Sequence, residues 1–149
     1  LLAIIFLFIS VDELISIHET LTDNTRAVLD DSARDYLYFA WVIPYVFIFG
    51  ILLILLLRFF ISLPRETKFR FAAAALIYVI GAVGLEMIAG NYVFDLGEQA
   101  KQSLPYMIMV TVEELFEMIG LIIFIHALVK YYLRSVADKS LVVTLSLNG

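Results

Sequence analysis

The sequence predicts an all-α membrane protein, a bundle of about four transmembrane helices. Hydrophobic residues make up 62% of the 149 residues and charged residues only 17%, whereas soluble domains are usually about 45–50% apolar. The apolar residues also gather in long runs separated by shorter polar segments. Because a chain of this length cannot hide so much apolar surface from water, we expect lipid to surround most of it.

A helix needs roughly 20 apolar residues to cross a bilayer, and four apolar runs reach or approach this length. The predicted spans are about residues 1–17, 36–63, 71–94 and 104–132, which form a transmembrane bundle over residues 1–134. The first run begins without a Met, so we expect further N-terminal helices in a longer chain. Residues 135–149 are expected to be a cytoplasmic tail or the start of a further segment. No alternation of period two with turn signals recurs, which argues against a β-barrel.

The basic residues predict how the spans are oriented, because Lys and Arg concentrate on the cytoplasmic side of a membrane. They cluster after the second span, at Arg65, Lys68 and Arg70, and at the end of the fourth, at Lys130 and Arg134. Both ends, and the C-terminus, should therefore be cytoplasmic. The loops over residues 19–35 and 95–101 are richer in acids and should face outward.

Aromatic residues gather where the second span is expected to enter the membrane. Tyr36, Tyr38, Trp41 and Tyr45 are interpreted as an interfacial belt, in which amphipathic rings sit at headgroup level. Pro44, within this group, is expected to kink the helix near its outer end.

Acidic residues lie inside three of the four spans, which is the most informative feature of the sequence. They are Asp12 and Glu13 in the first span, Glu86 in the third, and Glu113, Glu114 and Glu117 in the fourth. With a rise of about 1.5 Å per residue, all of them fall in the outer half of the bilayer. No Lys or Arg accompanies them. Because a charge in hydrocarbon is costly, such residues are expected to be functional.

Acidic side chains can be accommodated at this depth in four ways. The carboxyls are protonated, His18 supplies a charge, a water-filled cavity solvates them, or a bound cation neutralises them. Carboxylates with an imidazole suit Zn, Fe or Mn, whereas oxygen ligands alone suit Ca, Mg or Mn. The expected metal ligands are His18, Glu86, Glu113 and Glu117. Asp12 or Glu114 is then left as catalytic base or as an outer partner of the metal.

Several classes of site are disfavoured by composition. The chain has no Cys, which removes thiolate chemistry, and only two His, which removes any site of three imidazoles. It has no Glu-x-x-His pair of the kind that di-iron bundles use. The net charge of −5 argues against nucleic acid as a partner. His126, close to Lys130, is interpreted as an interface residue.

Four segments, FLFISVDELISIHE, FAWVIPYVFIFGILL, GAVGLEMIAG and TVEELFEMIG, resemble an uncharacterised family of bacterial multipass membrane proteins. That family carries a Ser-x-Asp-Glu-x-x-x-x-His-Glu helix, a Gly-Leu-Glu helix and a Glu-Glu-x-x-Glu helix. The resemblance covers the chain up to about Arg134. It implies additional N-terminal spans and a bacterial inner (plasma) or internal membrane, but no particular activity.

The leading hypothesis is a membrane protein whose carboxylate and His pocket binds a metal or another cation. In its more specific form, the protein is a membrane-embedded metalloenzyme acting on a lipid-soluble substrate. Two alternatives stay open. One is a non-enzymatic subunit of a larger membrane complex, with other membrane subunits as partners besides the lipid bilayer. The other is a proton or cation relay in transport, although only His126 is polar between Glu117 and Lys130.

Overall fold

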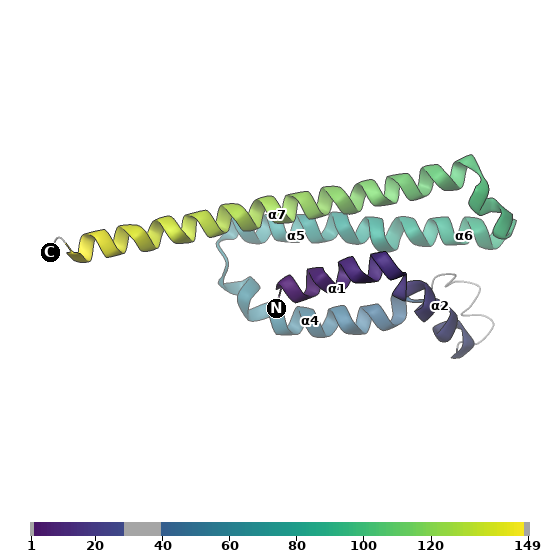
Figure 1. The fold of residues 1–149 in the computed structure, drawn as a ribbon, viewed down its shortest axis with the longest axis horizontal. Helices are drawn as coiled ribbons and strands as arrows, with labels where there is room; N and C mark the ends of the chain where they lie inside the picture. The colour runs from purple at the N-terminus through teal and green to yellow at the C-terminus, as the bar shows by residue number, and fades with distance from the viewer. Residues whose placement is uncertain (1, 29–39, 148–149) are drawn as a thin grey trace. The chain divides into compact units, whose positions relative to one another are not determined.

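The computed structural model describes residues 2–28 and 40–147, which form helices joined by short turns (Figure 1). Within these ranges the side chains of Glu13, His18, Glu19, Asp23, Arg26, Val28 and residues 138–147 are not described. The prediction of an all-α chain is confirmed for the described residues, which include no strand. Contacts divide the chain into unit 1, Leu1–Leu55 with Leu85–Val110, and unit 2, Leu56–Gly84 with Thr111–Gly149.

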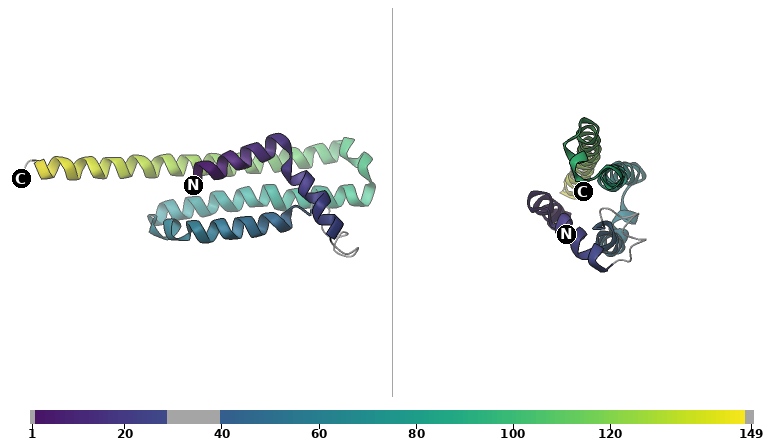
Figure 2. Two further views of the ribbon diagram at one scale, coloured as in Figure 1. Left: turned by 60° about the horizontal axis from the view of Figure 1, so that its bottom comes forward. Right: turned by 90° about the vertical axis from the view of Figure 1, so that its right-hand side faces the viewer.

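Unit 1 begins with two helices that meet at a bend. Helix α1 covers Leu2–Ile15 and α2 covers Ile17–Val28, and the chain changes direction between them (Figure 2). Ser16, at the bend, has a φ of 51°, a left-handed conformation that is uncommon for a residue with a Cβ. The first predicted span therefore ends at Ser16, and residues 19–28, predicted to be part of a loop, are helical. The 14 residues of α1 are fewer than a full crossing needs.

Helix α4, Val42–Ser62, corresponds to the second predicted span and runs from unit 1 into unit 2. It begins later than expected, and Tyr36 and Tyr38 lie outside the described residues. Pro44 stands in the first turn of α4. A proline costs no helical hydrogen bond there, since the first N–H groups of a helix have no partner within it. The predicted kink at Pro44 is therefore wrong.

The third predicted span lies in an uninterrupted helical segment from Arg65 to Leu96. It consists of α5 (Arg65–Val79), the π-helix η1 (Ile80–Leu85) and α6 (Glu86–Leu96). This segment and α4 are the two described helices that are long and apolar enough to cross a membrane. Gly97 ends α6 with a φ of +84°, which glycine adopts without steric cost. The short helix η2 (Glu98–Gln102) follows it.

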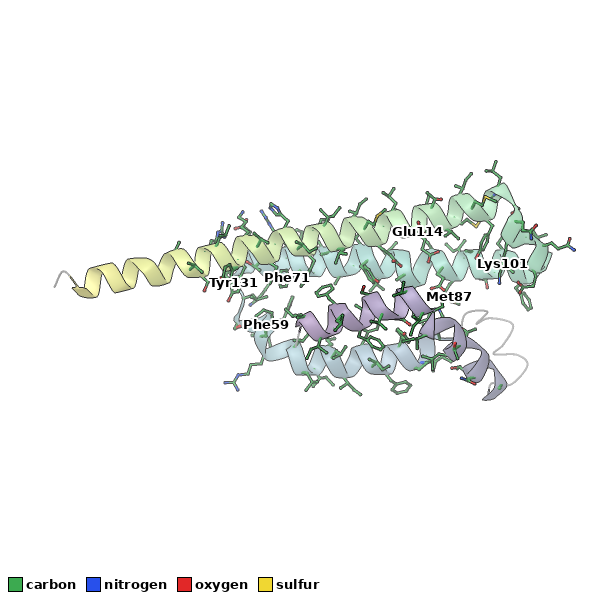
Figure 3. The ribbon with its side chains drawn as sticks, viewed as in Figure 1. Phe59, Phe71, Met87, Lys101, Glu114 and Tyr131 are labelled. Atoms are coloured by element: carbon green, nitrogen blue, oxygen red, sulfur yellow. The ribbon has the colours of Figure 1, made fainter. Side chains whose placement is uncertain are left out.

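Helix α7, Leu104–Leu147, contains the fourth predicted span and continues through most of the tail. The Ser103 hydroxyl accepts a 3.4 Å hydrogen bond from the Tyr106 N–H and so caps its first turn. In unit 2, α7 packs against the ends of α4 and α5 through a core of Leu63, Phe71 and Ala127. Phe59 and Tyr131 pack on this core and lie close to Phe71 in Figure 3.

Candidate functional site

The acidic residues singled out in the sequence are divided between the two units. Asp12 and Glu86 belong to unit 1, whereas Glu113, Glu114 and Glu117 belong to unit 2. The predicted ligand His18 lies in α2, but its side chain, like that of Glu13, is outside the described ones. The carboxylates therefore form two groups.

Asp12 is the most buried of these acids, with 7% of its surface exposed. Its carboxylate lies beside the hydroxyl of Tyr45, which α4 brings against α1, where the rings of Phe8 and Tyr45 are 6.4 Å apart. Tyr45 is only 5% exposed. Its hydroxyl oxygen is buried and makes no hydrogen bond of ordinary geometry with the described residues. The Asp12 carboxylate is thus a polar neighbour of this hydroxyl, and the two place oxygen atoms side by side in a buried position.

Glu86 is held by the aromatic residue that precedes α4. The Trp41 indole Nε1 donates a 3.0 Å hydrogen bond to Glu86 Oε1. Trp41 is 7% exposed, and its ring meets that of Tyr45 edge to face, with centroids 4.9 Å apart. Trp41 and Tyr45 are therefore packed within the chain, and their place at the membrane interface stays a prediction. Their spacing of four residues places them together, and buried Trp N–H groups normally find an acceptor.

These four residues, Asp12, Trp41, Tyr45 and Glu86, are called the aromatic–acid site. Both carboxylates border the same aromatic pair, one at the Tyr45 hydroxyl and one at the Trp41 indole. The sequence places no Lys or Arg between residues 1 and 25 or between residues 71 and 100. Carboxylate and phenol oxygens are hard ligands that suit cations such as Mn²⁺, Mg²⁺ or Ca²⁺.

The described side chains do not form a complete metal site. Among them, no three His, Asp or Glu residues gather closely enough to hold a metal ion. The aromatic–acid site contributes two carboxylates and one hydroxyl, fewer than the six to eight oxygens that Ca²⁺ prefers. The described residues therefore fit a cation held partly by other ligands.

The acids of unit 2 lie on α7 in two different settings. Glu113 and Glu117 are partly buried, and the face that carries them packs on Gly81 of η1. A Cβ placed on Gly81 would lie 2.9 Å from the Glu113 carbonyl oxygen and 3.1 Å from Glu117 Cγ. Gly120, one turn beyond Glu117 on α7, is buried against Ala74 and Tyr78. Glu114 is exposed, so it lies off this packed face.

Unit 2 also contains an ion cluster that the sequence did not single out. The Glu66 carboxylate accepts hydrogen bonds of 2.8 Å from Arg70, Lys130 and Arg134. The bonds from Lys130 and Arg134 lower the pKa of Glu66, which precedes the apolar run that begins at Phe71, to about 2. The spacing of Glu66 and Arg70 suggests a helical pair. No local pattern indicates the partners 64 and 68 residues away.

The remaining sequence predictions for this region concern the two basic segments and His126. The segments around Arg70 and Lys130, predicted to share one side of the membrane, meet directly at Glu66. His126 is exposed on α7.

Comparison with known families matches residues 1–131 to one described as "Domain of unknown function (DUF8692)". No curated protein and no solved structure matches the chain.

Proposed function

The chain belongs to the DUF8692 family, a domain of unknown function, and we propose that it is a multipass integral membrane protein that binds a cation at the carboxylates of Asp12 and Glu86. The carrying observation is the buried Asp12 carboxylate beside the buried Tyr45 hydroxyl, which places two oxygen ligands next to each other.

Membrane insertion is supported by how the apolar side chains are distributed. Two helices are long and apolar enough to cross a bilayer, and their apolar side chains are largely exposed, with Phe47 and Ile54 of α4 more than 70% exposed. In a soluble protein such helices would be core helices, buried on most sides. The proposed location is a bacterial inner or internal membrane, with the Glu66 end and the C-terminus cytoplasmic.

Cation binding is supported by the types of ligand in the aromatic–acid site, which are carboxylate and phenol oxygens. Two carboxylates border an aromatic pair, and the helices that carry them have no Lys or Arg nearby in sequence. Trp41 donates to one oxygen of Glu86, and a carboxylate has lone pairs for further partners. A cation would neutralise both acids and use the Tyr45 oxygen as a neutral ligand.

We further propose that His18, a predicted ligand of the same unit, extends the ligand set if the ion is Zn, Fe or Mn. Imidazole is the ligand type that distinguishes these metals from Mg and Ca. Catalysis on a lipid-soluble substrate would require the metal to keep an open position. Asp12 or Glu114 stays the proposed base for such a reaction, or an outer partner of the metal.

The test is the metal content of the purified protein, measured by elemental mass spectrometry. We expect a near-stoichiometric metal in the wild type and its loss in the Asp12→Asn and Glu86→Gln variants. Glu98→Gln is the matched control, since Glu98 is an exposed acid of the same unit paired with Lys101 at 2.8 Å. The control should keep the metal.

Absence of metal from wild type and variants alike, with all proteins folded, would contradict cation binding and leave the acids protonated. Loss of metal in Glu98→Gln as well would place the ion on the surface. Recovery of the wild type in the aqueous phase after detergent phase separation would contradict membrane insertion.

A second candidate function, a non-enzymatic subunit of a larger membrane complex, is favoured by Glu114. It is exposed on α7 between the exposed apolar residues Val112, Leu115 and Met118. A carboxylate facing lipid is costly, so a partner helix that covers Glu114 would lower the free energy. The test is the mass of the protein extracted in mild detergent. A single chain in wild type and Glu114→Gln alike would contradict this candidate.

A further inference from the structure

The ion cluster of unit 2 carries more positive than negative charge. The Glu66 cluster consists of one carboxylate, Glu66, and three cations, Arg70, Lys130 and Arg134. With one negative and three positive side chains, its net charge is +2. The three cationic side chains are 33%, 37% and 51% exposed. The cluster is therefore a partly open, positively charged surface.

The geometry forces the three cations close together. Arg70 Nη2 and Lys130 Nζ both donate to Oε1 of Glu66, and Arg134 Nη1 donates to Oε2, each at 2.8 Å. A guanidinium carries five N–H donors in a fixed fork, and these bonds use only one from each Arg. The remaining donors and the mutual repulsion of the cations favour a second anion over the cluster.

Exposed apolar side chains stand next to two of the cations in the sequence. Phe69, next to Arg70, is 75% exposed, and Leu133, next to Arg134, is 61% exposed. Phe71 and Leu63 form a buried core beneath the same region. A free inorganic anion would gain nothing from Phe69 and Leu133, whereas an amphiphile would contact them with its acyl chains.

We propose that the Glu66 cluster binds the phosphate of an anionic phospholipid headgroup. This inference rests on the membrane location proposed above, which places the cluster where the apolar run beginning at Phe71 leaves the hydrocarbon. Arg forks bind phosphate oxygens in pairs, and Lys130 adds a point charge. Glu66 holds the three cations in position and competes with the phosphate for them.

The experiment measures lipid retention by native mass spectrometry of the full chain in detergent. The probes are dioleoylphosphatidylglycerol, dioleoylphosphatidylcholine and inorganic phosphate. We expect preferential retention of the phosphatidylglycerol and no displacement of it by millimolar phosphate. Arg134→Gln should weaken retention about fivefold, the effect of one basic residue near a membrane surface. Lys101→Gln, which removes a Lys outside the cluster, should leave it unchanged.

The Glu66→Gln variant distinguishes lipid binding by the Glu66 cluster from a purely structural role of the cluster. If the cluster only stabilises unit 2, this variant and Arg134→Gln should both impair the protein. If it binds lipid phosphate, Glu66→Gln should strengthen retention, because it removes the competing carboxylate. Equal retention of the two lipids, or unchanged retention in a folded Arg134→Gln variant, would overturn the proposal. Displacement by inorganic phosphate would show a phosphate site that does not need a lipid.

The experiments on the lipid proposal and on the cation proposal have independent outcomes. Asp12→Asn leaves the Glu66 cluster intact, so it should retain phosphatidylglycerol whether or not it has lost a metal.

Discussion

The indole Nε1 of Trp41 donates a 3.0 Å hydrogen bond to Oε1 of Glu86, 45 residues further along the chain. This bond joins the start of α4 to the first residue of α6 within unit 1. It explains how a carboxylate in an apolar segment is tolerated, since a buried acid needs a donor or a charge. It also makes Trp41 a positioning residue for the aromatic–acid site.

Trp41→Phe is expected to lower the free energy of unfolding by about 1–3 kcal/mol. The substitution keeps much of the ring but removes the indole's hydrogen bond to the Glu86 carboxylate, and hydrogen bonds to charged groups are among the stronger ones. Thermal unfolding in detergent measures the effect. Glu86→Gln is the control, because its amide oxygen still accepts the indole N–H and should cost less. An equal loss in both variants would contradict this account of the bond.

Tyr45→Phe is expected to leave stability unchanged or to raise it by up to about 2 kcal/mol. The substitution removes a buried hydroxyl that makes no hydrogen bond with the described residues, and removing an unsatisfied polar group is neutral or favourable. The same variant should lose bound cation, since it lacks the proposed neutral ligand. Unfolding curves and metal content check the two parts. A marked loss of stability would show that the hydroxyl is fully bonded in the native state.

Gly120→Ala is expected to destabilise unit 2 by about 1–3 kcal/mol, the usual cost of overpacking. The new Cβ would lie 2.9 Å from the Ala74 carbonyl oxygen and from the Tyr78 backbone N. Backbone atoms cannot move aside as a flexible side chain can. Gly50→Ala is the matched control, because nothing lies within 4 Å of its Cβ, and it should gain up to about 1 kcal/mol of helix propensity. Similar unfolding temperatures for both variants would contradict close packing at Gly120.

The Glu66 carboxylate is expected to stay ionised well below the normal range of Glu. Its pKa is lowered from 4.5 to about 2 by Lys130 and Arg134. Because the folded-state pKa is depressed, the stabilisation is complete above pH 4.5 and is lost as the pH falls toward 2. The infrared carboxylate band, taken as the difference between wild type and Glu66→Gln, should persist at about pH 3.5. Protonation of this group near pH 4.5 would show that the ion pairs do not persist in solution.

Local features of the sequence were sufficient to predict most of the helices. The runs that contain α4, the segment Arg65–Leu96 and α7 were identified from apolar length alone, since composition and period are properties of a short stretch of chain. The predicted ends of the helices were less accurate. Pro44 was expected to kink a helix that in fact begins at Val42, and residues 19–28 were expected to be a loop.

The candidate site was predicted only in part. Asp12 and Glu86 were singled out because carboxylates are costly in apolar segments, and both have a defined setting in unit 1. Their aromatic neighbours were assigned to the lipid interface, since Trp and Tyr near the end of a span usually lie there. The metal ligand set stays a prediction, because it includes His18 and joins residues of two units.

The sequence by itself determined which segments are helical and apolar and which acids lie within them, because these properties depend on neighbouring residues. Only the tertiary structure decided that Trp41 meets Glu86, that Tyr45 lies beside Asp12, and that Glu66 gathers three cations. Contacts between helices depend on the rotation and register of each helix, which are set when the whole core packs. No pattern within a single segment encodes them.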